Sequence, residues 1–126
     1  MPYSIVASPN EDIVSVVHTG TVSIDELESV VSELEERFRG KSLQGLLVDT
    51  RGVESGPEVS EYVVWARGRG DKPWIARKMA LLTGDGFAEI MSHVSMAAQS
   101  MGAAVWSFAD EAEALDWLAR PIGSER

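Results

Sequence analysis

Short apolar segments alternate with amphipathic helical segments along almost the whole chain, and this alternation restricts the fold more than any single motif. Two segments rich in β-branched and apolar residues, 3–7 and 13–19, are separated by SPNED, which is typical of a turn. After this hairpin, each apolar run is followed by a segment with helical spacing. The predicted order is β-β-α-β-α-β-α-β-α, which indicates an α/β fold with a mostly parallel sheet and an antiparallel edge.

The first and last helices have the clearest start signals. Ser23 predicts an N-cap, and Glu26 three residues later gives the spacing of a capping box. One helical stripe of apolar residues follows, namely Leu27, Val30, Val31, Leu34 and Phe38. Gly40 is the expected stop of this helix. Asp110 with Glu113 repeats the capping-box spacing and predicts the start of the last helix.

The central part of the chain contains the strands expected to form the middle of the sheet. Beyond the hairpin, strands are expected at residues 44–49, 78–83 and 103–108. The run LQGLLVDT is continuous and apolar, as expected for a strand buried on both faces. Ser55 with Glu58 again has capping-box spacing. We therefore expect Ser55 to start a helix and Asp49 to Gly52 to be a strand exit.

Length, composition and charge limit the class of protein. The 126 residues, 44% of them hydrophobic, predict one domain over residues 1–120 and a loose tail over 121–126. The absence of cysteine excludes disulfides and thiolate sites, and two distant histidines give no reason to expect a metal or cofactor. The formal charge of −9 disfavours nucleic acid as a partner. Without a signal sequence or a run long enough to span a membrane, we expect a soluble cytoplasmic protein.

Three passages, in this order of elements, resemble the SpoIIAA-like or STAS-like superfamily, especially its uncharacterised bacterial SpoIIAA-like branch. They are TVSIDEL, LLVDTRG and VWSFADEAEALDWL. The resemblance implies a single four- to five-stranded mixed sheet with helices packed mainly on one face. It also implies a regulatory or binding module more often than an enzyme. Members of the anti-sigma antagonist branch are phosphorylated on a serine after the central strand, which makes Ser55 the candidate phosphorylation site here. An ordinary helix cap is the alternative role of Ser55.

Two groups of residues are candidates for a ligand or partner surface. Asp49, Thr50 and Arg51 end the central strand, where a carboxylate and a guanidinium could bind a polar ligand. Alternatively, Asp49 accepts from nearby backbone donors in an Asx-type turn. Trp65 and Trp74 flank a basic, glycine-rich segment and predict an aromatic patch for a protein partner or a second copy of the chain. The alternative is a glycine-rich loop in which the two tryptophans have no binding role.

Two functional hypotheses follow from these observations. The first is a non-enzymatic STAS-like module that binds a protein partner, itself or a small apolar ligand. The second is a small enzyme, or a polar-ligand-binding protein, that uses Asp49 and Arg51 with His18 or His93. The sequence contains no evident set of nucleophile, base and orienting group, which favours the first hypothesis and assigns no catalytic residue. The second hypothesis requires these side chains to share one cleft.

Overall fold

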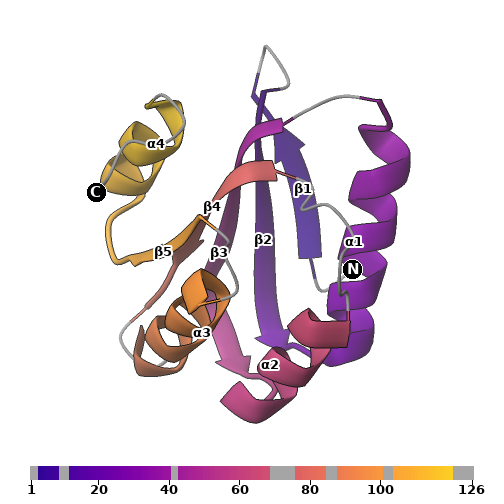
Figure 1. The fold of residues 1–126 in the computed structure, drawn as a ribbon, viewed down its shortest axis with the longest axis vertical. Coiled ribbons are helices and arrows are strands. Elements are labelled where there is room, and N and C mark those ends of the chain that lie inside the picture. The colour runs from indigo at the N-terminus through magenta and orange to yellow at the C-terminus, as the bar shows by residue number, and fades with distance from the viewer. Residues whose placement is uncertain are drawn as a thin grey trace.

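The computed structural model describes residues 3–8, 12–40, 43–68, 76–84, 88–100 and 104–120. Within these ranges, five strands form one sheet in the order β1-β2-β3-β4-β5 (Figure 1). The strands are β1 (Tyr3–Ala7), β2 (Ile13–Thr21), β3 (Leu43–Ser55), β4 (Ala76–Leu82) and β5 (Val105–Phe108). The helices are α1 (Ile24–Arg37), α2 (Val59–Gly68), α3 (Ala88–Ser100) and α4 (Glu111–Ala119). The expected tail at 121–126 and Trp74 lie outside the described residues.

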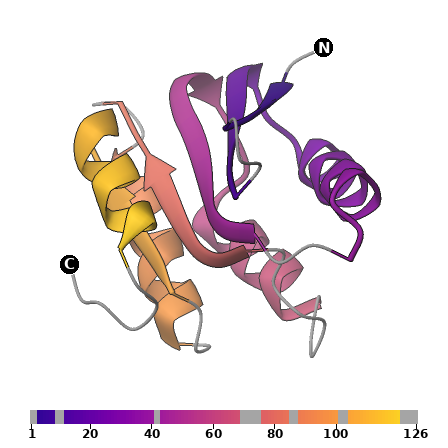
Figure 2. The same cartoon turned by 90° about the horizontal axis from the view of Figure 1, so that it is seen from above.

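The sheet topology explains where the helices lie. β1 pairs with β2 in the antiparallel sense, and the other neighbours pair in parallel, which confirms the predicted mixed sheet. Because the strand order follows the chain order and parallel crossovers are right-handed, the three crossover helices fall on the same face. These helices are α1, α2 and α3. The last helix, α4, follows β5 and packs on the other face, across the sheet from α1 (Figure 2).

The central strand β3 contributes to the hydrophobic core on both faces of the sheet. Leu46 belongs to a buried cluster with Leu34 of α1, whereas the next residue, Leu47, belongs to a cluster with Trp117 and Leu118 of α4. Neighbouring strand residues point to opposite faces, so a strand covered on both sides needs a continuous apolar run. A further cluster joins the sheet to α2 and α3 through Tyr62, Leu81, Met91, Ala98 and Val105.

The predicted starts of the first and last helices are confirmed by their hydrogen bonds. The Ser23 hydroxyl accepts from the backbone N–H of Glu26 at 3.2 Å, directly before α1. The Asp110 carboxylate accepts from the backbone N–H groups of Ala112 at 2.7 Å and Glu113 at 3.3 Å, directly before α4. Gly40 has a φ of +79°, a conformation that favours glycine, and it follows the end of α1. These helix starts can be predicted from sequence because each capping hydrogen bond joins residues that are close in sequence.

The predicted strand exit at Asp49 to Gly52 is wrong, because β3 continues to Ser55. The extension has a partner in β2, which runs to Thr21 and pairs Gly20 with Val53 and Thr21 with Ser55. Pairing with β4 ends earlier, at Asp49. The C-terminal part of β3 therefore forms a two-stranded ribbon with β2 that projects beyond the rest of the sheet.

The predicted helix start at Ser55 is wrong for the same reason. The Ser55 carbonyl accepts from the backbone N–H of Val22 at 2.9 Å, and its hydroxyl lies 3.1 Å from the hydroxyl of Thr21. The second helix, α2, begins four residues later than that prediction, at Val59. Its first turn is closed by Glu61, whose carboxylate accepts from the backbone N–H of Glu58 at 3.1 Å.

Candidate functional site

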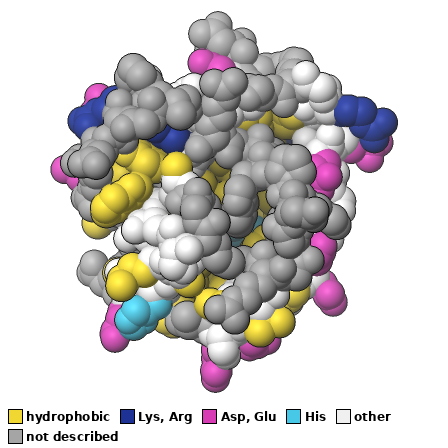
Figure 3. All heavy atoms as spheres, in the orientation of Figure 1, with side chains coloured by type: hydrophobic (Ala, Val, Ile, Leu, Met, Phe, Trp, Pro, Cys, Tyr) yellow, Lys and Arg dark blue, Asp and Glu magenta, His cyan; other side chains and the backbone are white. Residues whose placement is uncertain are grey.

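A cavity of ≈ 140 Å³ lies between the sheet and the helices α1, α2 and α3. Its walls are mostly apolar side chains, contributed by β2, β3, β4 and β5 as well as by the three helices, and it is partly open to solvent. Hydrophobic side chains are also visible on the surface over α2 and α3 (Figure 3). An engineered apolar cavity of about 150 Å³ in another protein binds benzene, so this void is large enough for an aromatic ring.

The most buried polar residue of the cavity wall is His18 on β2, which is 2% exposed. Its Nδ1 lies 2.5 Å from Oε2 of Glu26 on α1, and Glu26 is itself 8% exposed. An ionised carboxylate can only accept, so the Nδ1–H of His18 donates to Glu26. None of the hydrogen bonds among the described residues uses Nε2 of His18.

Two hydroxyl groups line the same cavity. Thr50 on β3 belongs to the cavity wall and donates its hydroxyl to the carbonyl of Leu82 at 2.9 Å. Tyr62 on α2 is 9% exposed. Burial and, to a smaller extent, the charge of Glu26 raise the pKa of Tyr62 to about 12. The Tyr62 phenol is therefore protonated at neutral pH.

Trp65 on α2 also lines the cavity. Its indole N–H donates to the Glu28 carboxylate of α1, so this side chain links the two helices that border the cavity. Trp65 is partly buried rather than fully exposed. Because Trp74 lies outside the described residues, the surface expected at Trp65 and Trp74 for a protein partner or a second copy of the chain stays a prediction.

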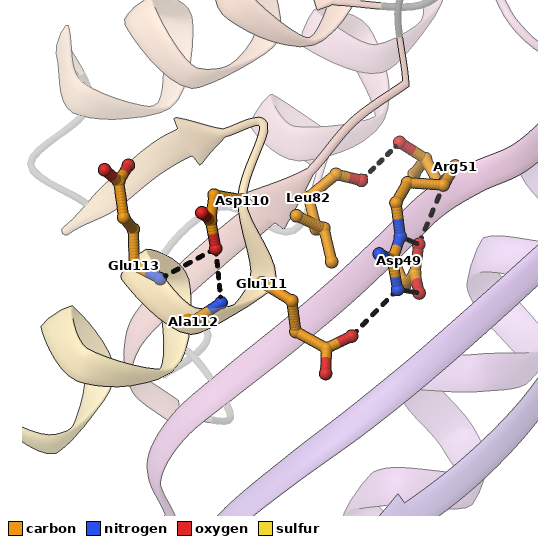
Figure 4. A network of polar contacts seen from close by, with 8 residues as sticks. Asp49, Arg51, Leu82, Asp110, Glu111, Ala112 and Glu113 are labelled. Carbon is orange, nitrogen blue, oxygen red and sulfur yellow. Dashed lines mark hydrogen bonds and ion pairs between the residues drawn. The ribbon is translucent and has the colours of Figure 1, made fainter.

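Asp49 and Arg51 form a second polar cluster on the other face of the sheet, next to the start of α4 (Figure 4). The guanidinium of Arg51 donates to both Asp49 carboxylate oxygens, at 3.1 and 2.8 Å, and to the Glu111 carboxylate at 2.8 Å. The backbone N–H of Arg51 also donates to Asp49, at 3.0 Å, which is the local contact expected of an Asx-type turn. The guanidinium therefore already has two carboxylate partners within the chain.

The electrostatics of this cluster follow from those contacts. Burial alone would raise the pKa of Asp49, but the hydrogen bonds from Arg51 hold this pKa below its ordinary value. Reciprocally, the hydrogen bond that Arg51 donates to Asp49 holds the pKa of Arg51 above its ordinary value. Both groups stay charged across the physiological range, so the cluster is a fixed ion pair rather than an acid–base catalyst.

Comparison with known proteins gives the family. A family model described as SpoIIAA-like matches residues 13–119. This chain belongs to the SpoIIAA-like family. An uncharacterised protein of the DUF3478 family from Shewanella loihica PV-4, with a SpoIIAA-like fold in its crystal structure, aligns with a TM-score of 0.61. The alignment covers 93% of this chain and 92% of that one at 17% sequence identity, which shows a shared fold. Comparison with curated proteins finds no match.

In this SpoIIAA-like domain, the residues proposed from sequence do not form one site. Asp49 and Arg51 contact α4, whereas His18 lines the cavity on the opposite face and His93 is exposed on α3. The set required by the enzyme hypothesis is therefore not gathered in one cleft. Ser55 is exposed at the end of β3.

The sequence predicts no site role for Glu26 or Tyr62, and it offers His18 only as an alternative to His93 in the enzyme hypothesis. A usable signal was present on β2, where His18 follows Val14 and Val16 on one face of the strand. A titratable group on an otherwise apolar strand face needs a buried partner. Glu26 is that partner, but its capping-box spacing gave it another explanation.

In the described ranges, no three or more His, Asp or Glu side chains are grouped so that they could hold a metal ion. None of the four described helices combines the length and the apolar character needed to cross a membrane.

Proposed function

We propose that this SpoIIAA-like domain is a binding module for a small apolar ligand, which it holds in the cavity between the sheet and α1, α2 and α3. The observation that carries the proposal is the cavity itself, with its ≈ 140 Å³ volume, apolar walls and few polar groups. Ligand sites commonly have this composition, in which apolar walls supply affinity and a few polar groups supply orientation.

Packing energetics support the same conclusion. Protein interiors are close-packed, and a void deprives its walls of dispersion contacts. In a single domain, such a void lowers stability unless something fills it. On the α4 face the chain achieves full burial, with Leu82, Ala114 and Leu118 each 0% exposed. The open volume on the other face is therefore best explained by a ligand that occupies it.

The alternative ligand site, the Asp49–Arg51 rim, has less support. A polar or anionic ligand there would have to displace Glu111 or Asp49 from Arg51, and it would meet their negative charges. The separation of this rim from His18 and His93 also removes support for an enzyme built on those four residues. Ser55 is exposed and remains a candidate phosphorylation site, independent of the cavity.

The test uses toluene as the probe, because its size matches the cavity. We expect saturable changes in the NMR signals of cavity methyl groups when toluene is titrated into the purified protein. Ala98→Leu places a larger side chain in the cavity and should weaken toluene binding about tenfold or more, a loss of about 1.4 kcal/mol. Ala112→Leu, the same substitution on the exposed side of α4, should leave it unchanged. Absence of saturable binding, or equal affinity in both variants, would contradict the proposal.

A further inference from the structure

We infer that the hydroxyl of Tyr62 is the polar contact of the cavity, and that it donates to a neutral oxygen acceptor, such as a carbonyl, on an otherwise apolar ligand. The inference rests on the proposed function and specifies the chemistry of its ligand. It depends on three features of Tyr62: its burial against the cavity, the lack of a partner for its hydroxyl, and the charges around it.

Tyr62 lies where α2, α3 and the sheet enclose the cavity. The buried cluster that contains Tyr62 also contains Leu81, Met91, Ala98 and Val105, and all five side chains line the cavity. Tyr62 is 9% exposed, and burial is the main reason that its pKa is raised, so the phenolic oxygen itself is withdrawn from water. The side chains that surround Tyr62 in this cluster are all apolar.

The two tyrosines of the chain are equally buried but differ in their hydrogen bonds. The hydroxyl of Tyr3 donates to the Glu33 carboxylate at 3.0 Å, whereas no hydrogen bond among the described residues uses the hydroxyl of Tyr62. A buried hydroxyl without a partner costs free energy, because its hydrogen bonds to water in the unfolded chain are not replaced. A ligand in the cavity would supply the missing hydrogen bond.

The protonation state of Tyr62 specifies what the ligand must offer. With a pKa of about 12, the phenol keeps its hydrogen at neutral pH and needs an acceptor for it. Carbonyl, ether and hydroxyl oxygens can accept this hydrogen. An ammonium group only donates, and a hydrocarbon does neither, so both leave the phenolic hydrogen unpaired.

The charges near Tyr62 favour a neutral acceptor over a carboxylate. In addition to burial, the negative charges of Glu26 and Glu61 raise the pKa of Tyr62, so both charges act on this hydroxyl. The described cavity wall contains no lysine or arginine, and His18 can compensate at most the charge of Glu26, to which it donates. A ligand carboxylate beside Tyr62 would therefore meet the uncompensated charge of Glu61.

The test compares cyclohexanone with methylenecyclohexane, a hydrocarbon of the same shape in which a CH₂ group replaces the carbonyl oxygen. Binding of both probes to the wild-type protein and to Tyr62→Phe is followed by NMR titration. Tyr62→Phe should weaken cyclohexanone binding roughly 3- to 10-fold and leave methylenecyclohexane binding unchanged. Tyr3→Phe is the matched control, because Tyr3 is equally buried but is not part of the cavity wall, and it should change neither affinity. Cyclohexanecarboxylate should bind more weakly than cyclohexanone to the wild-type protein.

A second measurement needs no ligand. Tyr62→Phe removes a hydroxyl without a partner and should not lower the midpoint of urea unfolding of the unliganded protein. Tyr3→Phe removes the hydrogen bond to Glu33 and should lower that midpoint. An equal fall in both variants would show that the Tyr62 hydroxyl has a partner within the protein, and would overturn the inference.

The binding results separate the inference from the proposed function. An equal loss of both probes in Tyr62→Phe, no effect of this substitution on cyclohexanone, or tighter binding of cyclohexanecarboxylate than of cyclohexanone would overturn the inference and leave the proposed function standing. If none of toluene, methylenecyclohexane and cyclohexanone binds, the proposed function fails as well.

Discussion

The two faces of the sheet are covered differently: a helix packs directly on one face, whereas the other encloses the cavity proposed to bind a ligand. On one face a single helix, α4, packs directly on the strands. Gly45 on β3 makes this approach possible, because a Cβ atom at that position would lie 2.8 Å from Cδ2 of Leu118. On the other face three helices cover a larger part of the sheet but leave a cavity of ≈ 140 Å³ at their junction. The face with more helices is the less completely packed one.

Polar contacts strengthen the attachment of α4. Lys78 on β4 is 2% exposed, and its ammonium group donates to the carbonyls of Trp117 at 2.9 Å and Arg120 at 3.0 Å. These carbonyls lie at the C-terminal end of α4, where helix acceptors run short of partners, although the Trp117 carbonyl also accepts from the backbone N–H of Arg120 at 3.2 Å. Burial lowers the pKa of Lys78, and the same ammonium lies 4.9 Å from the ring centroid of Trp117. We interpret the α4 face as the part of the domain that holds the strands of the sheet in place.

The largest expected effect is on that face. Leu118→Ala removes a side chain that is 0% exposed and packed in the cluster around Trp117, and it should lower the free energy of unfolding by about 2–5 kcal/mol. Chemical denaturation would measure the loss. Because α4 does not border the cavity, toluene affinity of the folded variant should stay at the wild-type value. A fall in affinity as large as the fall in stability would show that the two faces are coupled.

Two substitutions that enlarge a side chain should have the next largest effect on stability, and the sign of this effect should be opposite on the two faces of the sheet. Gly45→Ala adds a Cβ atom against Leu118 and should destabilise the protein by about 1–3 kcal/mol. Ala98→Leu adds volume where the cavity is open and should stabilise the unliganded protein by about 0.5–2 kcal/mol. Thermal unfolding of both variants without ligand provides the comparison. Destabilisation by Ala98→Leu equal to that by Gly45→Ala would mean that both faces are fully packed.

The sequence predicted those parts of the fold that depend on local signals. The cap at Asp110 bonds to residues two and three positions later, so the start of α4 is visible without any tertiary information. The order of strands and helices follows from periodicity in the same way. The family resemblance, confirmed by the match over residues 13–119, rests on this order and on the passages at its two ends.

The wrong helix start at Ser55 and the cavity that was not predicted both depend on contacts between segments that are distant in sequence. The spacing of Ser55 and Glu58 imitates a helix cap, but Ser55 is used by the bond from Val22, which no local pattern reveals. The cavity likewise results from how far apart three helices lie on the sheet. Its polar pair joins His18 on a strand to Glu26 on a helix, and the capping-box spacing already accounts for Glu26 without any reference to His18.

The smallest expected effect concerns the Asp49–Arg51 pair, and its dependence on pH distinguishes it from a packing change. The folded pKa of Asp49 is below the ordinary value because of Arg51, so this pair contributes stability above the unfolded pKa of about 3.9 and loses it as pH falls through the folded pKa. Arg51→Ala should therefore cost about 1 kcal/mol or less at pH 7, since the guanidinium side chain is 46% exposed and screened by solvent. The difference in stability from wild type should shrink below pH 4 and vanish once Asp49 is protonated in both states.

Urea unfolding at several pH values measures this difference in stability between Arg51→Ala and wild type. Toluene affinity at pH 7 is expected to stay unchanged. A loss that persists at low pH would assign Arg51 a packing role, and a loss of toluene binding would connect the Asp49–Arg51 rim to the cavity across the sheet.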